Sequence, residues 1–198
     1  MQMFSRFTKK KSIKLITLLS ILFLLQGCAA VAVVTLATSV SMATDRRSIG
    51  NQIDDQNIEL AVYNELTKDN AINNNTRLHI TSVNGSALLT GQAPNTYLKD
   101  KAIKIVNSIK GIVRIHDQIR IIKVTSITTQ TSDAWLTSKI KAALLSSDNV
   151  NADVIKVVTE NSEVFLMGLV TKKEADIATD IARNIGGVKS VYKAFEYI

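Results

Sequence analysis

The sequence predicts an α+β protein built from two similar small domains, and three observations lead to this fold class. Beyond Asp54 the chain repeats itself with an offset of 76 to 78 residues. Each copy contains two strand-like runs joined by a short turn, Asn84-Gly85 in the first and Asn161-Ser162 in the second. Apolar residues spaced by four precede each turn, and helix-like segments follow it.

Each copy opens with an amphipathic helix. Residues spaced by four lie on one helical face, so they form a stripe that packs against a core. The first copy carries Ile58, Val62 and Leu66 at this spacing, and the second carries Leu136, Ile140 and Leu144.

A β-hairpin follows each helix. We expect strands over residues 76–83 and 86–92 in the first copy and over 154–160 and 163–170 in the second. Asn-Gly between two strand-like runs is the strongest short hairpin signal. Gly91 and Gly168 fall at the same place near the end of each second strand.

A second helix and a third strand complete each copy. Helices are expected over 97–109 and 172–185, the latter starting at a capping box of Thr171 and Glu174. Gly111 and Gly187 follow these helices, where a left-handed backbone is expected. Strands over 112–124 and 188–198 then close each unit. Each copy is thus helix, strand, strand, helix, strand, which predicts a three-stranded mixed sheet covered by two helices.

The repeat defines the domain organisation. We expect a signal peptide at 1–27, a flexible tether at 28–53, a first domain at 54–124, a linker at 125–132 and a second domain at 133–198. Units of this size are near the lower limit for a free-standing core. The two domains are therefore expected to pack on each other or to be modestly stable alone.

The N-terminus has the pattern of a secretory signal peptide. Five basic residues precede an uncharged stretch that begins at Leu15, and Leu25-Gln26-Gly27-Cys28 ends it. This tetrad resembles a bacterial lipobox, in which the cysteine thiol receives a diacylglyceryl group and the new N-terminus an acyl chain. Two alternatives stay open: an incidental cysteine, and an uncleaved anchor, since residues 15–44 are uncharged and long enough to span a bilayer. Ala29 rather than Asp after the cysteine implies, by the same resemblance, the outer membrane.

Composition excludes some functions. Removing residues 1–27 leaves 19 basic and 17 acidic residues, a net charge of +2, so nucleic-acid binding has little support. No cysteine remains for a disulfide. His79 and His116 are the only histidines, and we interpret both as strand residues without a catalytic role. Asp54-Asp55 and the pair Asp176 and Asp180 are interpreted as a helix-start charge and a solvated helix face. We therefore expect no metal, no cofactor and no enzymatic activity.

The repeat resembles the BON domain. The resemblance rests on the Leu-Xaa-Gly ends of the second strands and on the Gly-Ile/Val-Xaa-Xaa-Ile/Val starts of the third. Two such domains behind a lipobox resemble the dual-BON outer-membrane lipoproteins. The resemblance implies phospholipid binding, a role in envelope integrity and localisation to the division site. BON domains often have an asparagine two residues after the Val of the third-strand motif, where this chain has Asp117 and Lys193.

The first helix of the second domain carries a candidate lipid-binding strip. Trp135 lies outside the expected core face, and at about 100° per residue several positions share its side or border it. Trp suits the headgroup zone of a bilayer, and lysines attract anionic headgroups. Alternatively, Trp135 caps the core or fills a groove between the domains. The strip consists of Trp135, Ser138, Lys139, Lys141, Ala142 and Leu145.

These features favour a non-enzymatic lipoprotein at the periplasmic face of the outer membrane that binds anionic phospholipid. The alternative is a periplasmic interaction scaffold that docks outer-membrane assembly machinery or cell-wall factors. A third possibility is a binder of small envelope ligands, which would need a pocket.

Overall fold

The structure, a computed structural model, describes residues 45–124 and 127–198, and residues 45–198 form one compact unit. The first domain begins with α3 (Ile49–Lys68) and a short helix, α4 (Asn70–Asn75). The hairpin β1 (Arg77–Val83) and β2 (Ser86–Ala93) follows, and then α5 (Thr96–Asn107) and β3 (Arg114–Ile121).

The second domain repeats this order. It contains α6 (Ile127–Leu145), a 3₁₀ turn η1 (Ala152–Val154), β4 (Ile155–Glu160), β5 (Glu163–Val170), α7 (Lys172–Arg183) and β6 (Ser190–Tyr197). None of the helices in the described residues is both long and apolar enough to cross a bilayer.

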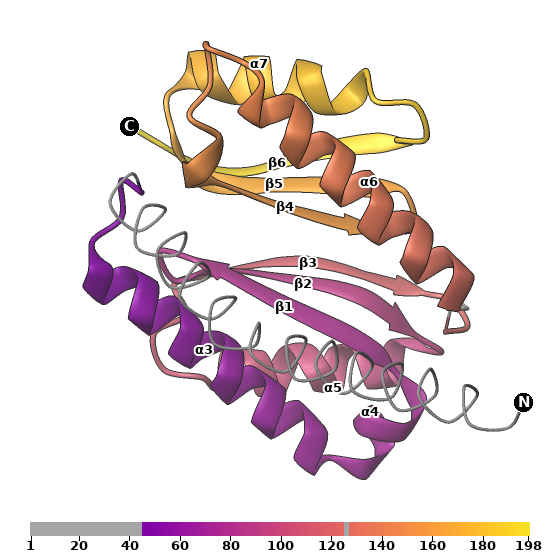
Figure 1. The fold of residues 1–198 in the computed structure, drawn as a ribbon. Coiled ribbons are helices and arrows are strands. Elements are labelled where there is room, and N and C mark those ends of the chain that lie inside the picture. Colours follow the sequence, from indigo (N-terminus) through magenta and orange to yellow (C-terminus); the bar gives the residue numbers. More distant parts are fainter. Residues whose placement is uncertain (1–44, 125–126) are drawn as a thin grey trace, which may run out of the picture. The chain divides into compact units, whose positions relative to one another are not determined.

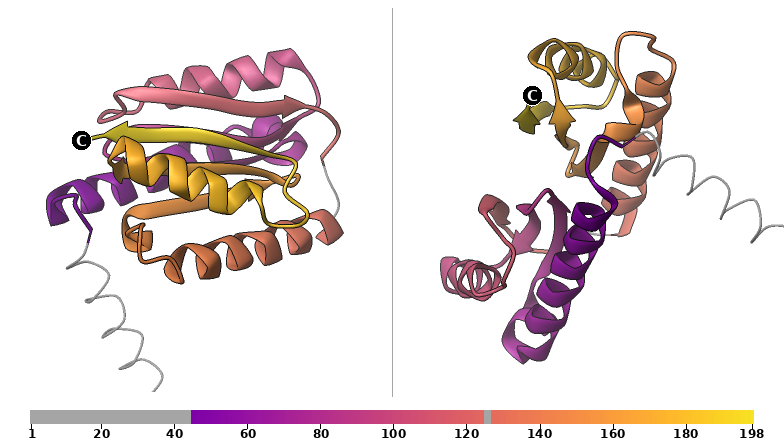
Figure 2. Two further views of the ribbon diagram at one scale, coloured as in Figure 1. Left: turned by 90° about the horizontal axis from the view of Figure 1, so that it is seen from above. Right: turned by 90° about the vertical axis from the view of Figure 1, so that its left-hand side faces the viewer.

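Each domain is a three-stranded mixed sheet with its helices on one face, as the sequence predicts (Figure 1). The strand orders are β1-β2-β3 and β4-β5-β6. The hairpin strands pair antiparallel and the third strand pairs parallel to the second, in both domains. The parallel pairing requires a crossover, which α5 and α7 supply. The two views of Figure 2 show α5 and α7 running alongside the strands that they connect.

Two segments that we placed outside the domains are helical. Residues 49–53, placed in the tether, form the first turn and a half of α3, and the Ser48 side chain caps it by accepting the Asn51 N–H at 3.0 Å. Residues 127–132, placed in the linker, belong to α6. Residues 49–53 bury only Gln52, and none of residues 129–132 is buried, so periodicity could not reveal these turns. The helices extend by continuing a turn that the domain core holds in place.

Two positions near the ends of the second strands, Gly91 and Gly168, have no room for a side chain. A Cβ on Gly91 would lie 2.0 Å from the Arg77 carbonyl oxygen, and one on Gly168 would lie 2.3 Å from that of Val154. Both residues have positive φ, 118° and 154°. Any other residue would therefore push the hairpin strands apart at this point.

The positive φ values of Gly111 and Gly187 are also as expected, 97° and 104°. The helices before them end earlier, however, with Ser108 and Asn184 as C-caps. Each glycine instead faces the first helix of its own domain, because an added Cβ would lie 3.2 Å from Ile58 and 3.1 Å from Leu136.

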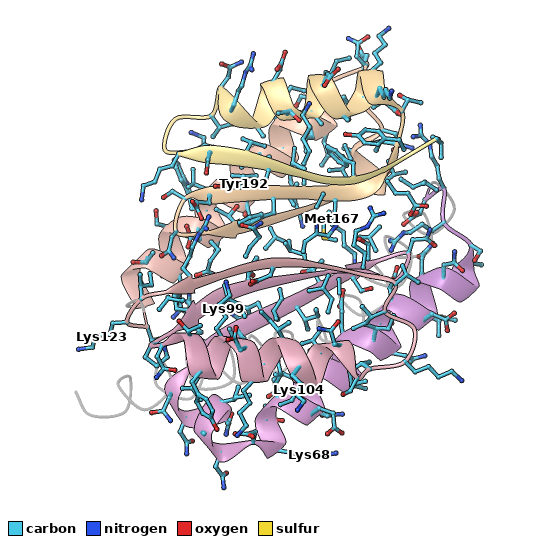
Figure 3. All side chains as sticks on the ribbon, turned by 180° about the vertical axis from the view of Figure 1, so that it is seen from behind. Lys68, Lys99, Lys104, Lys123, Met167 and Tyr192 are labelled. Carbon is cyan, nitrogen blue, oxygen red and sulfur yellow. The ribbon has the colours of Figure 1, made fainter. Side chains whose placement is uncertain are left out.

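The two sheets meet through a small apolar layer. Phe165 and Met167 of β5 and Ala194 of β6 are buried together with Val83 and Leu88 of the first domain. Figure 3 shows Met167 in this layer between the sheets. The expectation that the domains pack on each other is therefore confirmed.

Ion pairs surround this layer. Glu160 at the end of β4 is buried and accepts hydrogen bonds from Arg77 and Gln92 of the first domain. Arg120 of β3 donates to Glu163 of β5 at 2.7 Å. Burial makes Glu160 dependent on its partners, since an isolated carboxylate is costly away from water.

Candidate functional site

The inner face of α6 forms part of the core of the second domain. Leu136, Ile140 and Leu144 are at most 2% exposed. Asp133, one turn before Leu136, is also buried, and its carboxylate accepts the backbone N–H groups of Asn161 and Ser162, each at 2.8 Å. These contacts hold the helix against the sheet and determine which of its sides faces outward.

The outer face of α6 carries all six residues of the predicted strip, and all six are exposed. Trp135 is 57% exposed and Leu145 is 67% exposed. Trp135 therefore does not cap the core, which was one of the alternatives.

Lys139 lies directly against the indole. Its Nζ is 4.4 Å from the centroid of the Trp135 ring, which is the geometry of a cation–π contact between residues one turn apart. Ser138 donates its hydroxyl hydrogen to the Ala134 carbonyl at 3.0 Å, so it adds no free donor to the strip. The strip thus presents an apolar ring with a positive charge held beside it.

A cavity of about 520 Å³ lies at the C-terminal end of the strip. Lys141 and Leu145 line it together with strand residues of β4, and Glu59 and Thr81 of the first domain complete it. Lys156 in its wall is already paired, since its Nζ is 3.1 Å from a Glu59 oxygen and 2.8 Å from the Ser82 carbonyl. The cavity is open and mixed in character, so it extends the strip rather than forming a closed ligand site.

The histidines do not form a catalytic pair. His79 is exposed, and the Nε2 of His116 lies 3.1 Å from the Ser86 hydroxyl. Burial, with a smaller contribution from Arg114, lowers the pKa of His116 and so favours the neutral ring. Within the part of the chain that the structure describes, no group of three or more His, Cys, Asp or Glu side chains could hold a metal.

The two acidic pairs singled out in the sequence have different surroundings in the structure. Asp176 pairs with Lys193 at 2.7 Å and Asp180 with Arg183 at 3.1 Å, as a solvated helix face requires. Asp55, in contrast, is not a helix-start charge. It lies inside α3, 1% exposed.

Asp55 holds the first hairpin. Its carboxylate accepts the backbone N–H groups of Asn84 at 2.8 Å and Gly85 at 2.9 Å, and the Ser82 hydroxyl at 2.7 Å. Arg47 donates to it as well, at 2.6 Å. Asp133 does the same for the second hairpin, and its offset of 78 residues from Asp55 was a signal in the sequence that we missed.

Two arginines attach the start of the described chain to both domains. Arg46 forms two hydrogen bonds to Glu174 of α7, at 2.7 and 2.8 Å, while Arg47 pairs with Asp45 and Asp55. The hydrogen bond from Arg46 lowers the pKa of Glu174 to about 2, against the opposing effect of burial. The segment just before α3 is therefore positioned by ion pairs. Cys28, the predicted lipidation site, and the predicted signal peptide lie outside the described residues.

Comparison with known proteins identifies the family. The model of the BON domain matches residues 54–123 and 132–198. The chain is 38% identical to the outer membrane lipoprotein DolP of Haemophilus influenzae, over 93% of this chain and 96% of that protein. It is 36% identical to a 21 kDa hemolysin of Actinobacillus pleuropneumoniae, over 78% and 79% of the two chains.

A third relative is the osmotically-inducible protein Y of Escherichia coli, 30% identical over 72% of each chain. The family match covers both copies of the internal repeat, and the identity to DolP extends over nearly the whole chain. The chain therefore belongs to the BON-domain family and is a dual BON-domain protein similar to DolP.

Proposed function

We propose that this protein is an outer-membrane lipoprotein, anchored through Cys28 and facing the periplasm, whose second domain binds anionic phospholipid through the outer face of α6. Its role would be to support envelope integrity, at the division site. The similarity to the outer membrane lipoprotein DolP supports the proposed location at the outer membrane and the lipid anchor. The binding surface is supported by the exposed strip on α6.

One observation carries this proposal: Trp135 is exposed on the outer face of α6 with a lysine against its ring. An indole has an apolar body and a polar N–H, which suits the boundary between headgroups and acyl chains. Lys139 and Lys141 would each add about 1 kcal/mol of attraction near an anionic surface. Because an anchored protein has a high effective concentration at the bilayer, weak contacts of this kind suffice.

Vesicle co-sedimentation tests the binding surface. The lipid-free protein, residues 28–198 with Cys28→Ser, would be mixed with phosphatidylglycerol vesicles and with phosphatidylcholine vesicles. We expect binding to the anionic vesicles, weakened at high salt. Trp135→Glu should lower the bound fraction about tenfold or more, because it removes the apolar contact and adds a repelled charge.

A matched control keeps the test specific. Tyr97 of α5 is also an exposed aromatic residue, at 70%, on the first domain, so Tyr97→Glu adds the same charge away from the strip. It should leave binding unchanged. Equal binding by Trp135→Glu, Tyr97→Glu and the parent protein would contradict the proposal.

The scaffold alternative predicts a different crosslinking pattern. A photoreactive residue at position 135 in living cells should yield lipid adducts if α6 contacts the bilayer. A single protein adduct of defined mass would instead favour docking of an envelope protein on the same strip.

A further inference from the structure

The first domain has an apolar surface that the lipid-binding proposal does not use. Four large apolar side chains on the outward side of α3 are between 51% and 62% exposed. In the right-hand view of Figure 2, this helix lies at the periphery of residues 45–198. The four residues are Ile49, Ile53, Leu60 and Tyr63.

These residues recur with the spacing of a coiled-coil seam. Steps of four and three residues alternate from Ile49 to Ile53, Gln56, Leu60, Tyr63 and Thr67. These five steps average 3.6 residues, close to the heptad period of 3.5, so the six positions form one stripe that can face a partner helix. We call these six positions the α3 seam.

The α3 seam is separate from the face that builds the core. Ile58, Val62 and Leu66 are at most 7% exposed and face the sheet. At about 100° per residue, the α3 seam lies roughly opposite them. A second copy could therefore pack on this seam while Ile58, Val62 and Leu66 stay in the core of their own domain.

Charge makes a membrane a poor partner for the α3 seam. Asp55, Glu59 and Glu65 of this helix are paired with Arg47, Lys156 and Lys68. No seam position carries a lysine or an arginine, so the seam lacks the attraction to anionic headgroups that the lysines of α6 supply.

The positions that flank the α3 seam suit a second copy of the same helix. They are occupied by Gly50, Asn57 and Asn64 on one side and by Glu59 on the other, where Gln52 is buried in its own domain. Glu59 is already engaged by Lys156 and by the Ser82 N–H. No like charges would therefore oppose each other across a pair of seams, and a central Gln56 is the kind of polar seam residue that selects register.

We infer that two copies of this chain associate through the α3 seam. The occupant is a second copy because alternating steps of four and three suit a pair of helices, four of the six seam positions carry large apolar side chains, and the flanking positions of two copies would not repel each other. In an antiparallel pair Ile53 lies opposite Tyr63 and Gln56 opposite Leu60, whereas in a parallel pair each residue lies opposite itself. The inference is independent of lipid binding by α6.

Cysteine crosslinking in envelope membranes tests the inference with the full chain. Ile53→Cys and Tyr63→Cys would be expressed separately and together, each with a distinct tag, and oxidised mildly. Mixed disulfide dimers indicate an antiparallel pair, and dimers of either variant alone indicate a parallel pair. Both results support the inference, which is refuted if no dimer forms or if the only products are adducts with other proteins.

Three controls make the result specific. The parent chain, with Cys28 as its only cysteine, should give no dimer. Asp54→Cys places a thiol on the same helix away from the α3 seam and should also give none. Leu60→Asp would be added to each of the two cysteine variants, Ile53→Cys and Tyr63→Cys. The buried charge should weaken the pairing and lower the crosslinked fraction about tenfold. Leu60 is 59% exposed, so this variant should keep the circular dichroism melting curve of the parent.

Discussion

The adjacent residues Asp54 and Asp55 offer a sharp test of how the hairpins are held. Asp55 is 1% exposed and accepts four hydrogen bonds, whereas Asp54 is exposed. Asp55→Ala would leave the N–H groups of Asn84 and Gly85 and the Ser82 hydroxyl without their acceptor. Hydrogen bonds to a charged group are each worth about 1.5 to 3 kcal/mol, but the four are not additive.

We therefore expect Asp55→Ala to destabilise the protein by about 3 kcal/mol, and Asp54→Ala by less than about 0.5 kcal/mol. Urea denaturation of the lipid-free protein measures both. With a slope of about 1 to 3 kcal/mol per molar urea, the midpoint for Asp55→Ala should fall by about 1 to 3 M. Trp135, the only tryptophan, reports the second domain by fluorescence, and circular dichroism reports both domains.

The pH dependence of the same variant pair gives an independent check. Burial alone would raise the pKa of Asp55, but the hydrogen bonds from Gly85, Ser82 and Asn84 and the charge of Arg47 outweigh it and lower the pKa. The folded state therefore gains stability above the ordinary pKa of an aspartate, and this gain is lost as the pH falls below it. Asp55→Asn should flatten that part of the pH profile.

The urea comparison decides whether Asp55 holds the hairpin. Equal urea midpoints for Asp55→Ala and Asp54→Ala would refute the reasoning.

The remaining predictions concern other contacts. Gly168→Ala should cost about 2 kcal/mol in thermal denaturation because its Cβ meets the Val154 carbonyl, whereas Gly186→Ala, with open space around the added Cβ, should be within about 0.5 kcal/mol of the parent. Glu160→Ala should lower the free energy of unfolding by about 3 kcal/mol, because it leaves Arg77 without its carboxylate partner between the two domains. The urea transitions followed by fluorescence and by circular dichroism should coincide for the parent protein and separate for this variant. The Glu174 carboxylate should titrate near pH 2 by NMR and return toward 4.5 in Arg46→Met; its contribution to stability is present above pH 4.5 and lost as the pH falls toward 2.

Much of the fold was readable from local pattern. Some signals depend on only a few neighbouring residues. Examples are the turns at Asn84-Gly85 and Asn161-Ser162 and the four-residue spacing of Ile58, Val62 and Leu66. Such signals act through backbone geometry and helical periodicity, so they need no knowledge of distant contacts. The repeat then strengthened every element, because each signal occurred twice.

Helix ends and buried polar groups were not readable in this way. Residues 49–53 and 129–132 contribute a single buried side chain, that of Gln52, so no periodicity distinguished them from a linker. Asp55 looked like a helix-start charge because the donors that satisfy it come from a hairpin about 30 residues later.

The sequence by itself determined the two-copy α+β architecture and the candidate strip on α6, because both follow from short-range spacing. Only the tertiary structure decided which faces stay uncovered. Trp135 is exposed because Leu136 and Asp133 turn the other side of α6 toward the sheet, and the α3 seam is exposed because the core uses the opposite side of α3. Exposure is a property of what packs against a residue, so it becomes visible only when the distant partners are in place.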